Sequence, residues 1–322
     1  MKTLSEQLGQ LLIVGVDGNR LDAETEQFLR EIHPGGVIFF QRNIGTAAEF
    51  RGLVEQVGRV GTITPFLALD LEGGKVDRLR EAIAPLPAVR DVARAGLGEL
   101  MGKLAGRELG SFRLNLDFAP VLDLGTPECE KVMGSRTAGA TAEEVVAFAK
   151  GFLTGLAESL IVGCGKHFPG LGSGQTDSHL GLPVVEKDAQ SMWDEDLKPY
   201  RALVKELPMI MIAHVFCPEL ERAYSRGGSD AAERLPASLS RTIVTELLRK
   251  RIGFEGLVVC DDLEMGGVLE GRTQEQAAAA ALRAGCDLLL LCGPTENTRK
   301  VYAELLREAE SDLVLRSLIE QT

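Results

Sequence analysis

The amino-acid sequence predicts an α/β fold, a closed (β/α)8 barrel formed by a single domain over residues 1–322. Three observations support this prediction. Short apolar runs of β type recur eight times, amphipathic helical segments separate them, and neither a linker nor a low-complexity tract divides the chain. Apolar strands that alternate with helices are typical of a parallel sheet covered by helices. Eight such units in a chain of this length fit a closed barrel.

The elements can be placed in order from hydrophobic periodicity. The predicted strands are residues 11–16, 36–40, 66–70, 116–120, 160–166, 209–214, 256–261 and 286–291. The helical segments between them include residues 47–60, 94–112, 142–159, 188–207, 241–251 and 273–284. A doubly wound open sheet is the alternative. The turn after the first run, residues 15–18, lacks the GxGxxG fingerprint of many such sheets, which favours the barrel.

Composition excludes several classes of function. The formal net charge is −12, from 35 basic and 47 acidic residues. This argues against a nucleic-acid footprint or a basic membrane-binding face, since both need clustered Lys and Arg. No run has the length of a transmembrane helix, and no signal peptide is evident, so we expect a cytoplasmic protein. The sequence does not define the oligomeric state, and we expect a monomer.

The six cysteines lie in mostly apolar runs without CxxC spacing. This pattern predicts buried free thiols in a reducing compartment rather than a disulfide framework or a zinc site. We therefore expect neither a metal nor a cofactor.

Charged or imidazole side chains follow most of the predicted strands. In a barrel, functional groups gather where strands end and the loops to the next helix begin. These residues are Asp70, Glu72 and Arg78 after the third strand, Arg136 after the fourth, Lys166 and His167 at the end of the fifth, His214 at the sixth, and Asp261 and Asp262 at the seventh. The pattern predicts a functional site at this end of the barrel.

Residues 163–183 carry the densest group of proton-handling side chains. Lys166 and His167 end a strand, and a glycine-rich loop then carries Asp177 and His179. A carboxylate beside an imidazole stabilises its charged form and orients it, which suits a general acid and base. Such a pair can also be an ordinary turn in which Asp177 accepts from backbone amides and His179 packs. The nearby lysine and histidine favour a catalytic loop.

Asp261 closes an apolar strand, where a carboxylate can be a nucleophile, a metal ligand or a substrate clamp. Because successive strand side chains alternate between faces, Asp261 and Asp262 should not both face the site, and the pattern does not say which one does. Either could instead cap the following helix. The remaining candidates could hold sugar hydroxyls or anionic oxygens, or form a buried salt-bridge network. They are Asp70, Arg78, Arg136, Lys166 and His167.

Taken together, these motifs resemble family 3 glycoside hydrolases, in particular the single-domain β-N-acetylglucosaminidases of cell-wall recycling. The resemblance covers nearly the whole chain and includes Asp70-Leu71-Glu72-Gly73-Gly74, Phe118-Ala119-Pro120-Val121-Leu122-Asp123, Lys166-His167-Phe168-Pro169-Gly170, Asp177-Ser178-His179 and Asp261-Asp262-Leu263-Glu264-Met265. It implies that Asp261 is the nucleophile, His179 the acid/base and Asp177 its partner. It also implies that terminal N-acetylglucosamine is bound by Asp70, Arg78, Arg136, Lys166 and His167. One departure is Leu171, which stands where the family commonly has a second histidine.

The resemblance implies a retaining exo-β-N-acetylglucosaminidase that acts on muropeptides or related glycosides through a covalent glycosyl-enzyme. A β-glucosidase is an alternative in the same family. So is a phosphorylase, because a histidine acid/base repels phosphate less than a carboxylate would.

Two other hypotheses differ in kind. A metal-dependent hydrolase would use His167, His179, Asp177 and Asp261, but the first strand has no HxH motif and a lysine lies among the candidates. A non-catalytic sugar-binding barrel is disfavoured because the nucleophile and the Asp177–His179 pair are both present.

Overall fold

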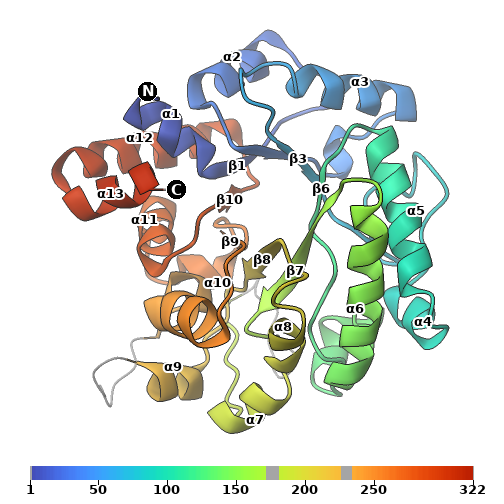
Figure 1. Ribbon diagram of the computed structural model, residues 1–322. Coiled ribbons are helices and arrows are strands. Elements are labelled where there is room, and N and C mark those ends of the chain that lie inside the picture. Colours follow the sequence, from blue (N-terminus) through green and yellow to red (C-terminus); the bar gives the residue numbers. More distant parts are fainter. Residues whose placement is uncertain (1, 172–180, 226–233, 322) are drawn as a thin grey trace.

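The computed structural model describes residues 2–171, 181–225 and 234–321 and contains an eight-stranded parallel barrel (Figure 1). Its strands are β1 (Leu12–Gly15), β2 (Gly36–Ile38), β3 (Phe66–Leu69), β6 (Leu116–Asp117), β7 (Val162–Phe168), β8 (Met209–Ile212), β9 (Leu257–Cys260) and β10 (Leu289–Leu291). They are hydrogen-bonded in the order β10-β1-β2-β3-β6-β7-β8-β9. A parallel bridge between Val259 and Leu288 joins the two ends of this order. The predicted (β/α)8 architecture is confirmed.

Each of the eight predicted apolar runs overlaps one barrel strand. Seven strands lie within the predicted run and are shorter than it, whereas β7 extends two residues beyond its run, to Phe168. The prediction missed a small antiparallel hairpin formed by β4 (Leu71–Gly73) and β5 (Val76–Asp77) directly after β3. Its turn uses Gly73 and Gly74, whose φ angles of 90° and 59° suit glycine. The hairpin carries Glu72 to the carboxyl end of the barrel.

The barrel strands bury both faces. The interior is filled by one cluster of buried side chains: Ile13, Ile38, Ala68, Leu116, Phe118, Cys164, Met209, Met211, Val259, Leu288, Leu290 and Cys292. Alternate residues such as Val14, Val37 and Leu69 belong instead to the layer between the strands and the helices. This alternation follows from the two-residue period of a strand and explains why the strands read as continuous apolar runs.

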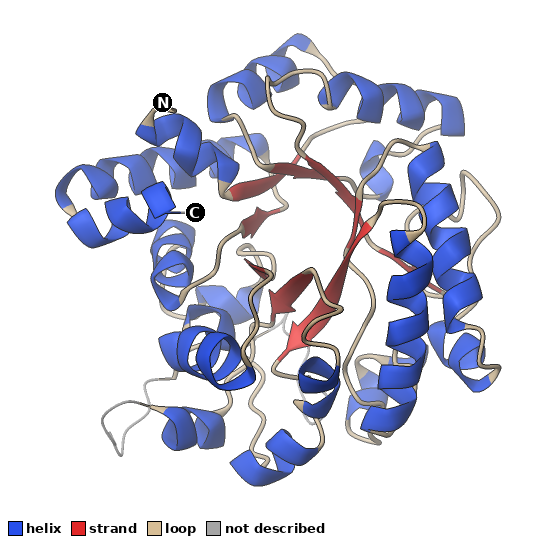
Figure 2. Ribbon diagram, in the orientation of Figure 1, coloured by secondary structure: helices blue, strands red, loops and turns tan. Residues whose placement is uncertain are grey.

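Helices enclose the strands (Figure 2). They are α1 (Leu4–Gln10), α2 (Ala23–Ile32), α3 (Ala47–Val57), α4 (Val89–Arg94), α5 (Gly98–Ser111), α6 (Ala142–Ala157), α7 (Ala189–Asp194), α8 (Lys198–Ala202), α9 (Pro218–Tyr224), the π-helix η5 (Thr242–Ile252), α10 (Gly266–Leu269), α11 (Gln274–Ala284), α12 (Thr295–Ser311) and α13 (Leu313–Gln321). Short 3-10 turns are η1 (Gln41–Asn43), η2 (Cys129–Lys131), η3 (Gly134–Arg136) and η4 (Ala237–Leu239). Thr46, Thr141 and Thr273 begin α3, α6 and α11 with capping boxes, which explains where these helices start.

Two predicted helical segments are each broken. In residues 94–112, Gly96 adopts a φ of 68° and ends the helical path, so α4 and α5 are separate. In residues 188–207, Pro199 lies in the first turn of α8. Proline cannot donate a backbone hydrogen bond to a preceding turn, so α7 and α8 do not join.

Helices α5 and α6 approach each other closely through glycines. A β-carbon built on Gly102 would lie 2.1 Å from the Phe152 carbonyl oxygen, and one on Gly155 would lie 2.4 Å from the Lys103 nitrogen. A β-carbon is not tolerated at such distances, so this contact requires glycine at both positions.

The first and last helices of the described chain pack on one another, since α1 contacts both α12 and α13 (Figure 1). The Tyr302 hydroxyl donates to the Ser5 carbonyl oxygen over 3.0 Å. These contacts agree with the single-domain prediction, which stays a prediction. No helix among the described residues combines the length and apolarity needed to cross a bilayer.

All six cysteines are buried free thiols, as the sequence predicts. Burial raises the pKa of each of them, to about 12 in the case of Cys129.

Candidate active site

A cavity of about 300 Å³ opens at the carboxyl ends of the barrel strands. Barrel-interior side chains, including Phe118, Met211 and Leu290, line its base. Its polar lining consists of Asp70, Glu72, Arg78, Arg136, Lys166, His167, Asp261 and Asp262. The fold therefore brings together Asp261 and all five residues predicted to bind substrate. Asp177 and His179 lie outside the described residues.

Lys166, at the end of β7, is the most deeply buried cation of the site, with 3% of its side chain exposed. Its Nζ lies 2.7 Å from Asp70 Oδ1 and 2.6 Å from Glu72 Oε1. Burial would lower the pKa of this ammonium, but the two carboxylates outweigh burial and raise it. Lys166 is therefore charged at any physiological pH.

Glu72 joins two of the three cations that line the cavity, Lys166 and Arg136. It accepts two hydrogen bonds from Arg136, 2.7 Å from Nε and 2.8 Å from Nη2, in addition to its ion pair with Lys166. Burial alone would raise the pKa of Glu72, but Lys166 and Arg136 lower it to about 2. Sequence reasoning placed Glu72 in a motif but gave it no role. Its position in the β4–β5 hairpin, too short to predict from periodicity, explains the omission.

Asp117, at the end of β6, supports the segment that carries Asp70 and Glu72. Its Oδ1 accepts from the Leu71 amide over 3.0 Å. Burial raises the pKa of this carboxyl well above its ordinary value. Asp117 thus fixes the backbone between the two acidic side chains.

Arg78 lies at the cavity wall, 3.8 Å from Asp70 Oδ2. Its guanidinium carbon lies 5.8 Å from the ring centroid of Phe40. Its Nε is buried and has no hydrogen-bond partner among the described residues. An unpaired buried donor is costly, so this nitrogen is suited to a ligand oxygen in the cavity.

His167 is held by a buried carboxylate. Its Nδ1 lies 2.7 Å from Asp123 Oδ2, and its backbone amide donates to the same oxygen over 3.3 Å. The other oxygen, Oδ1, accepts from the Leu171 amide over 2.7 Å. Asp123 therefore fixes both the His167 ring and the chain that leaves β7. Its role was missed because it depends on β6 and β7 being neighbours.

Asp261 and Asp262 follow β9, and both line the cavity. The expectation that only one of the two carboxylates points into the site stays a prediction. Asp262 Oδ1 accepts from the amides of Glu264 and Cys292, 3.2 and 3.1 Å away. Asp262 thus stabilises the turn but does not cap a helix, because α10 begins only at Gly266 and has Met265 as its N-cap. Burial raises its pKa to about 6.

His214, just beyond β8, is fully buried behind this turn. Its Nε2 lies 2.9 Å from the Asp262 carbonyl oxygen, and its Nδ1 lies 2.7 Å from the Ser238 hydroxyl. A carbonyl only accepts, so Nε2 carries the proton. The Asp261 amide in turn donates to the Ile212 carbonyl over 2.9 Å. Together these bonds hold the backbone from which Asp261 projects.

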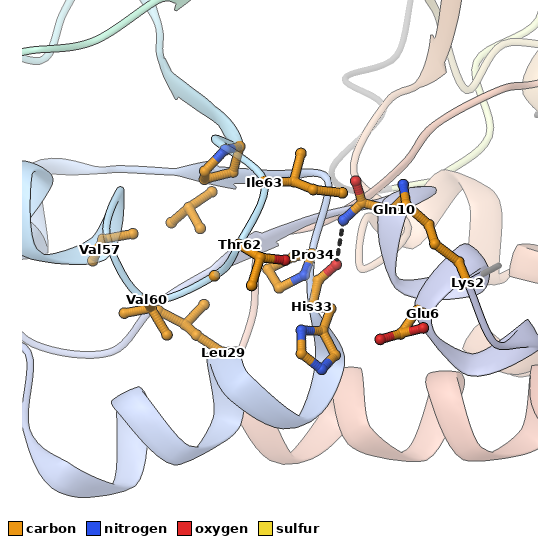
Figure 3. A pocket seen from close by; sticks show the side chains of 13 residues that line it. Lys2, Glu6, Gln10, Leu29, His33, Pro34, Val57, Val60, Thr62 and Ile63 are labelled. Carbon is orange, nitrogen blue, oxygen red and sulfur yellow. Dashed lines mark hydrogen bonds between the residues drawn. The ribbon is translucent and has the colours of Figure 1, made fainter.

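A smaller pocket of about 80 Å³ lies at the opposite end of the barrel (Figure 3). His33 and Pro34 at its rim precede β2, and apolar side chains such as Leu29 and Val57 line it. Gln10 Nε2 donates to the His33 carbonyl there over 2.7 Å (Figure 3). Catalytic groups of a parallel barrel gather at the carboxyl ends of strands, so this pocket is not a candidate active site.

In the part of the chain that the structure describes, no three His, Cys, Asp or Glu side chains are grouped as metal ligands. The metal-dependent hypothesis also needs Asp177 and His179, which lie outside that part.

Residues 3–321 match the model of the glycosyl hydrolase family 3 N terminal domain. The chain belongs to glycosyl hydrolase family 3. A β-hexosaminidase of Alkalilimnicola ehrlichii is 36% identical over 91% of this chain and 84% of that protein. A β-hexosaminidase of Pseudomonas aeruginosa is 34% identical over 92% of this chain and 86% of that protein.

Solved structures of family 3 members share the fold. A β-N-acetylglucosaminidase from Paenibacillus sp. str. FPU-7 has a TM-score of 0.92 and 29% identity, and all of this chain covers 61% of that longer one. NagZ from Neisseria gonorrhoeae, in complex with N-trifluoroacetyl-D-glucosamine, has a TM-score of 0.80 and 30% identity over 92% of this chain and 84% of that one. The family resemblance and the prediction of a glycoside hydrolase are confirmed, while the individual residue roles remain predictions.

Proposed function

We propose that this family 3 member is a retaining exo-β-N-acetylglucosaminidase that removes terminal N-acetylglucosamine through a covalent glycosyl-enzyme on Asp261. One observation carries the proposal. Asp261 lines the same small cavity as a charged cluster of Asp70, Lys166, Glu72 and Arg136. A sugar held by such a cluster would have its anomeric carbon within the same cavity as the nucleophile.

The size of the cavity supports exo action on one sugar unit. About 300 Å³ is at the lower end of the range for small-ligand sites. Apolar side chains such as Val132, Met133 and Met265 share the lining and provide a surface for an acetamido methyl group. The β-hexosaminidase relatives and the N-trifluoroacetyl-D-glucosamine bound to the Neisseria protein support the same sugar.

The proposed reaction has two steps. In the first, the Asp261 carboxylate attacks the anomeric carbon, and His179 gives its proton to the leaving glycosidic oxygen. In the second, His179 takes a proton from water, which attacks the same carbon and releases Asp261. Asp177 would orient His179 and stabilise its charged form. The roles of Asp177 and His179 are supported by the family resemblance.

The proposed substrates are muropeptide fragments or related glycosides in the cytoplasm. This finer assignment is supported by the resemblance to cell-wall recycling enzymes. Phosphate in place of water at the second step would give N-acetylglucosamine 1-phosphate, which product analysis distinguishes from the free sugar.

The test compares Asp261→Asn with Asp262→Asn on an aryl N-acetyl-β-glucosaminide. Asp261→Asn removes the nucleophile and should lower kcat by about a thousandfold or more. Asp262→Asn keeps an oxygen for the Glu264 and Cys292 amides and should stay within about tenfold of the parent.

Mass spectrometry of the quenched parent should detect one N-acetylglucosaminyl unit on Asp261. Near-full activity of a folded Asp261→Asn variant would disprove the mechanism. An aryl β-glucoside, with and without phosphate, completes the assay, and faster cleavage of the glucoside would overturn the sugar assignment.

A further inference from the structure

Another groove, of about 440 Å³, lies between helices of the described chain. Trp193 comes from α7, Arg201 from α8, and Arg251 from the last turn of η5. The full lining is Trp193, Lys198, Arg201, Ala202, Arg251 and Ile252. None of these residues lines the cavity that holds Asp261, so the groove is separate from the proposed active site.

The groove has a charge opposite to that of the whole chain. Three of its lining residues are cations and none is acidic, on a chain with a net charge of −12. Lys198 pairs with Glu143. Arg201 and Arg251 have no carboxylate within ion-pair distance among the residues that the structure describes. Two guanidinium charges are therefore available in one groove.

The two guanidinium groups are held close together. Their Cζ atoms lie 4.1 Å (Arg201) and 5.1 Å (Arg251) from the ring centroid of Trp193, so they are at most 9.2 Å apart. Arg201 Nη1 also donates to the Trp193 carbonyl oxygen over 2.9 Å. The Trp193 ring packs at 6.4 Å from that of Tyr224 on α9. Contacts of this kind order the side chains before a ligand arrives, which lowers the entropic cost of binding.

We propose that this groove binds a small multivalent anion between Arg201 and Arg251. Two like charges at this separation repel each other, and an anion with two acidic groups would neutralise both. The planar donor fork of each guanidinium matches carboxylate and phosphate oxygens equally well. A polyphosphate and a tricarboxylate share this chemistry, and separate titrations distinguish them.

Trp193 supplies the assay, because it is the only tryptophan of the chain. Its fluorescence is followed while the purified protein is titrated with tripolyphosphate, with citrate, and with sodium chloride at matched ionic strength. We expect a saturable change with at least one of the multivalent anions and none with chloride. The same anion should raise the thermal unfolding midpoint of the protein, because it binds the folded state.

Arg251→Gln is the decisive variant, since it removes one guanidinium and leaves the bond between Arg201 and Trp193 in place. We expect it to weaken anion binding about tenfold or more. Arg59→Gln is the control, because it removes an exposed guanidinium elsewhere and changes net charge equally.

Three results would overturn the proposal. They are the absence of both signals in the folded parent, a response that sodium chloride reproduces, and equal binding by parent and Arg251→Gln. Glycosidase activity should be the same in parent and Arg251→Gln, so this test is independent of the proposed catalytic function.

Discussion

Glu72 determines the electrostatic balance of the site. It lies between Lys166 and Arg136, and its side chain is 1% exposed. Without its charge, Lys166 would keep only its ion pair with Asp70, and Arg136 would have no ion pair among the described residues. A sugar has no net charge to compensate them, so the resting site must be neutralised by the protein itself. Glu72 allows two cationic donors to approach sugar hydroxyls without an unpaired buried charge.

Glu72→Gln should therefore destabilise the protein in a pH-dependent way. The folded-state pKa of about 2 lies below the ordinary 4.5, so the ionised carboxylate contributes stability above about pH 4.5 that is lost as pH falls towards 2. We expect Glu72→Gln to lower the free energy of unfolding by about 3 kcal/mol at pH 7. The difference from the parent should shrink towards zero near pH 2.

Urea unfolding at pH 7, 5 and 3 measures this difference. Glu310→Gln is the control, since Glu310 is exposed and has no ion-pair partner among the described residues. A Glu72→Gln effect that is the same at all three pH values would show that the loss is one of packing and not of charge.

The sequence predicted which residues form the site better than it predicted the contacts between them. Lys166, His167 and Asp261 were predictable because charged groups at the ends of apolar runs are conspicuous. The roles of Glu72, Asp123 and His214 depend on which strands become neighbours, and on the turn after β9. No local pattern contains that information. The motif Asp70-Leu71-Glu72-Gly73-Gly74 was the one sequence signal that pointed to Glu72.

Helices α5 and α6 lie so close together that there is no room for a side chain at Gly102. Gly102→Ala would place a methyl group against the Phe152 carbonyl and force the helices apart. We expect the free energy of unfolding to fall by about 1–3 kcal/mol, as for other overpacked sites. Thermal or urea unfolding measures it.

Gly110→Ala, in the same helix, is a matched control. A β-carbon there would meet no atom within 4 Å. Alanine is the better helix former, so this variant should be more stable than the parent by about 0.5–1 kcal/mol. Equal effects of the two substitutions would refute the close-approach explanation.

Whole elements were largely predictable, and the errors have identifiable causes. Apolar runs located every barrel strand. The hairpin β4–β5 was missed because its strands have three and two residues, too few to show a period. Two helical segments were joined across Gly96 and Pro199, where the amphipathic pattern continues although the backbone cannot.

For the molecule as a whole, the packing of α13 tests the single-domain prediction. Leu315 is fully buried, whereas the adjacent Val314 is 65% exposed. Leu315→Ala should lower the free energy of unfolding of the entire chain by about 2–5 kcal/mol in one transition. Val314→Ala should change it by less than about 0.5 kcal/mol.

Circular dichroism and loss of glycosidase activity should follow the same unfolding curve in both variants. A separate early transition in Leu315→Ala, with activity retained, would mean that the terminal helices form an independent unit.

The global architecture followed from the sequence because eight strand–helix units of this kind have few ways to close. Three features could not be predicted from the sequence, because each depends on contacts between segments distant in the chain. They are the size of the cavity, the groove around Trp193, and the bridge that joins β9 to the segment before β10.

The six cysteines offer a way to follow local opening of the structure. Alkylating reagents attack the thiolate, and burial disfavours the thiolate at all six positions. Cys292 lines the cavity, whereas modification of any of the other five cysteines requires that the surrounding structure open first. The rate of alkylation at each of these five thus measures how often that region opens in native buffer, position by position and without any denaturant.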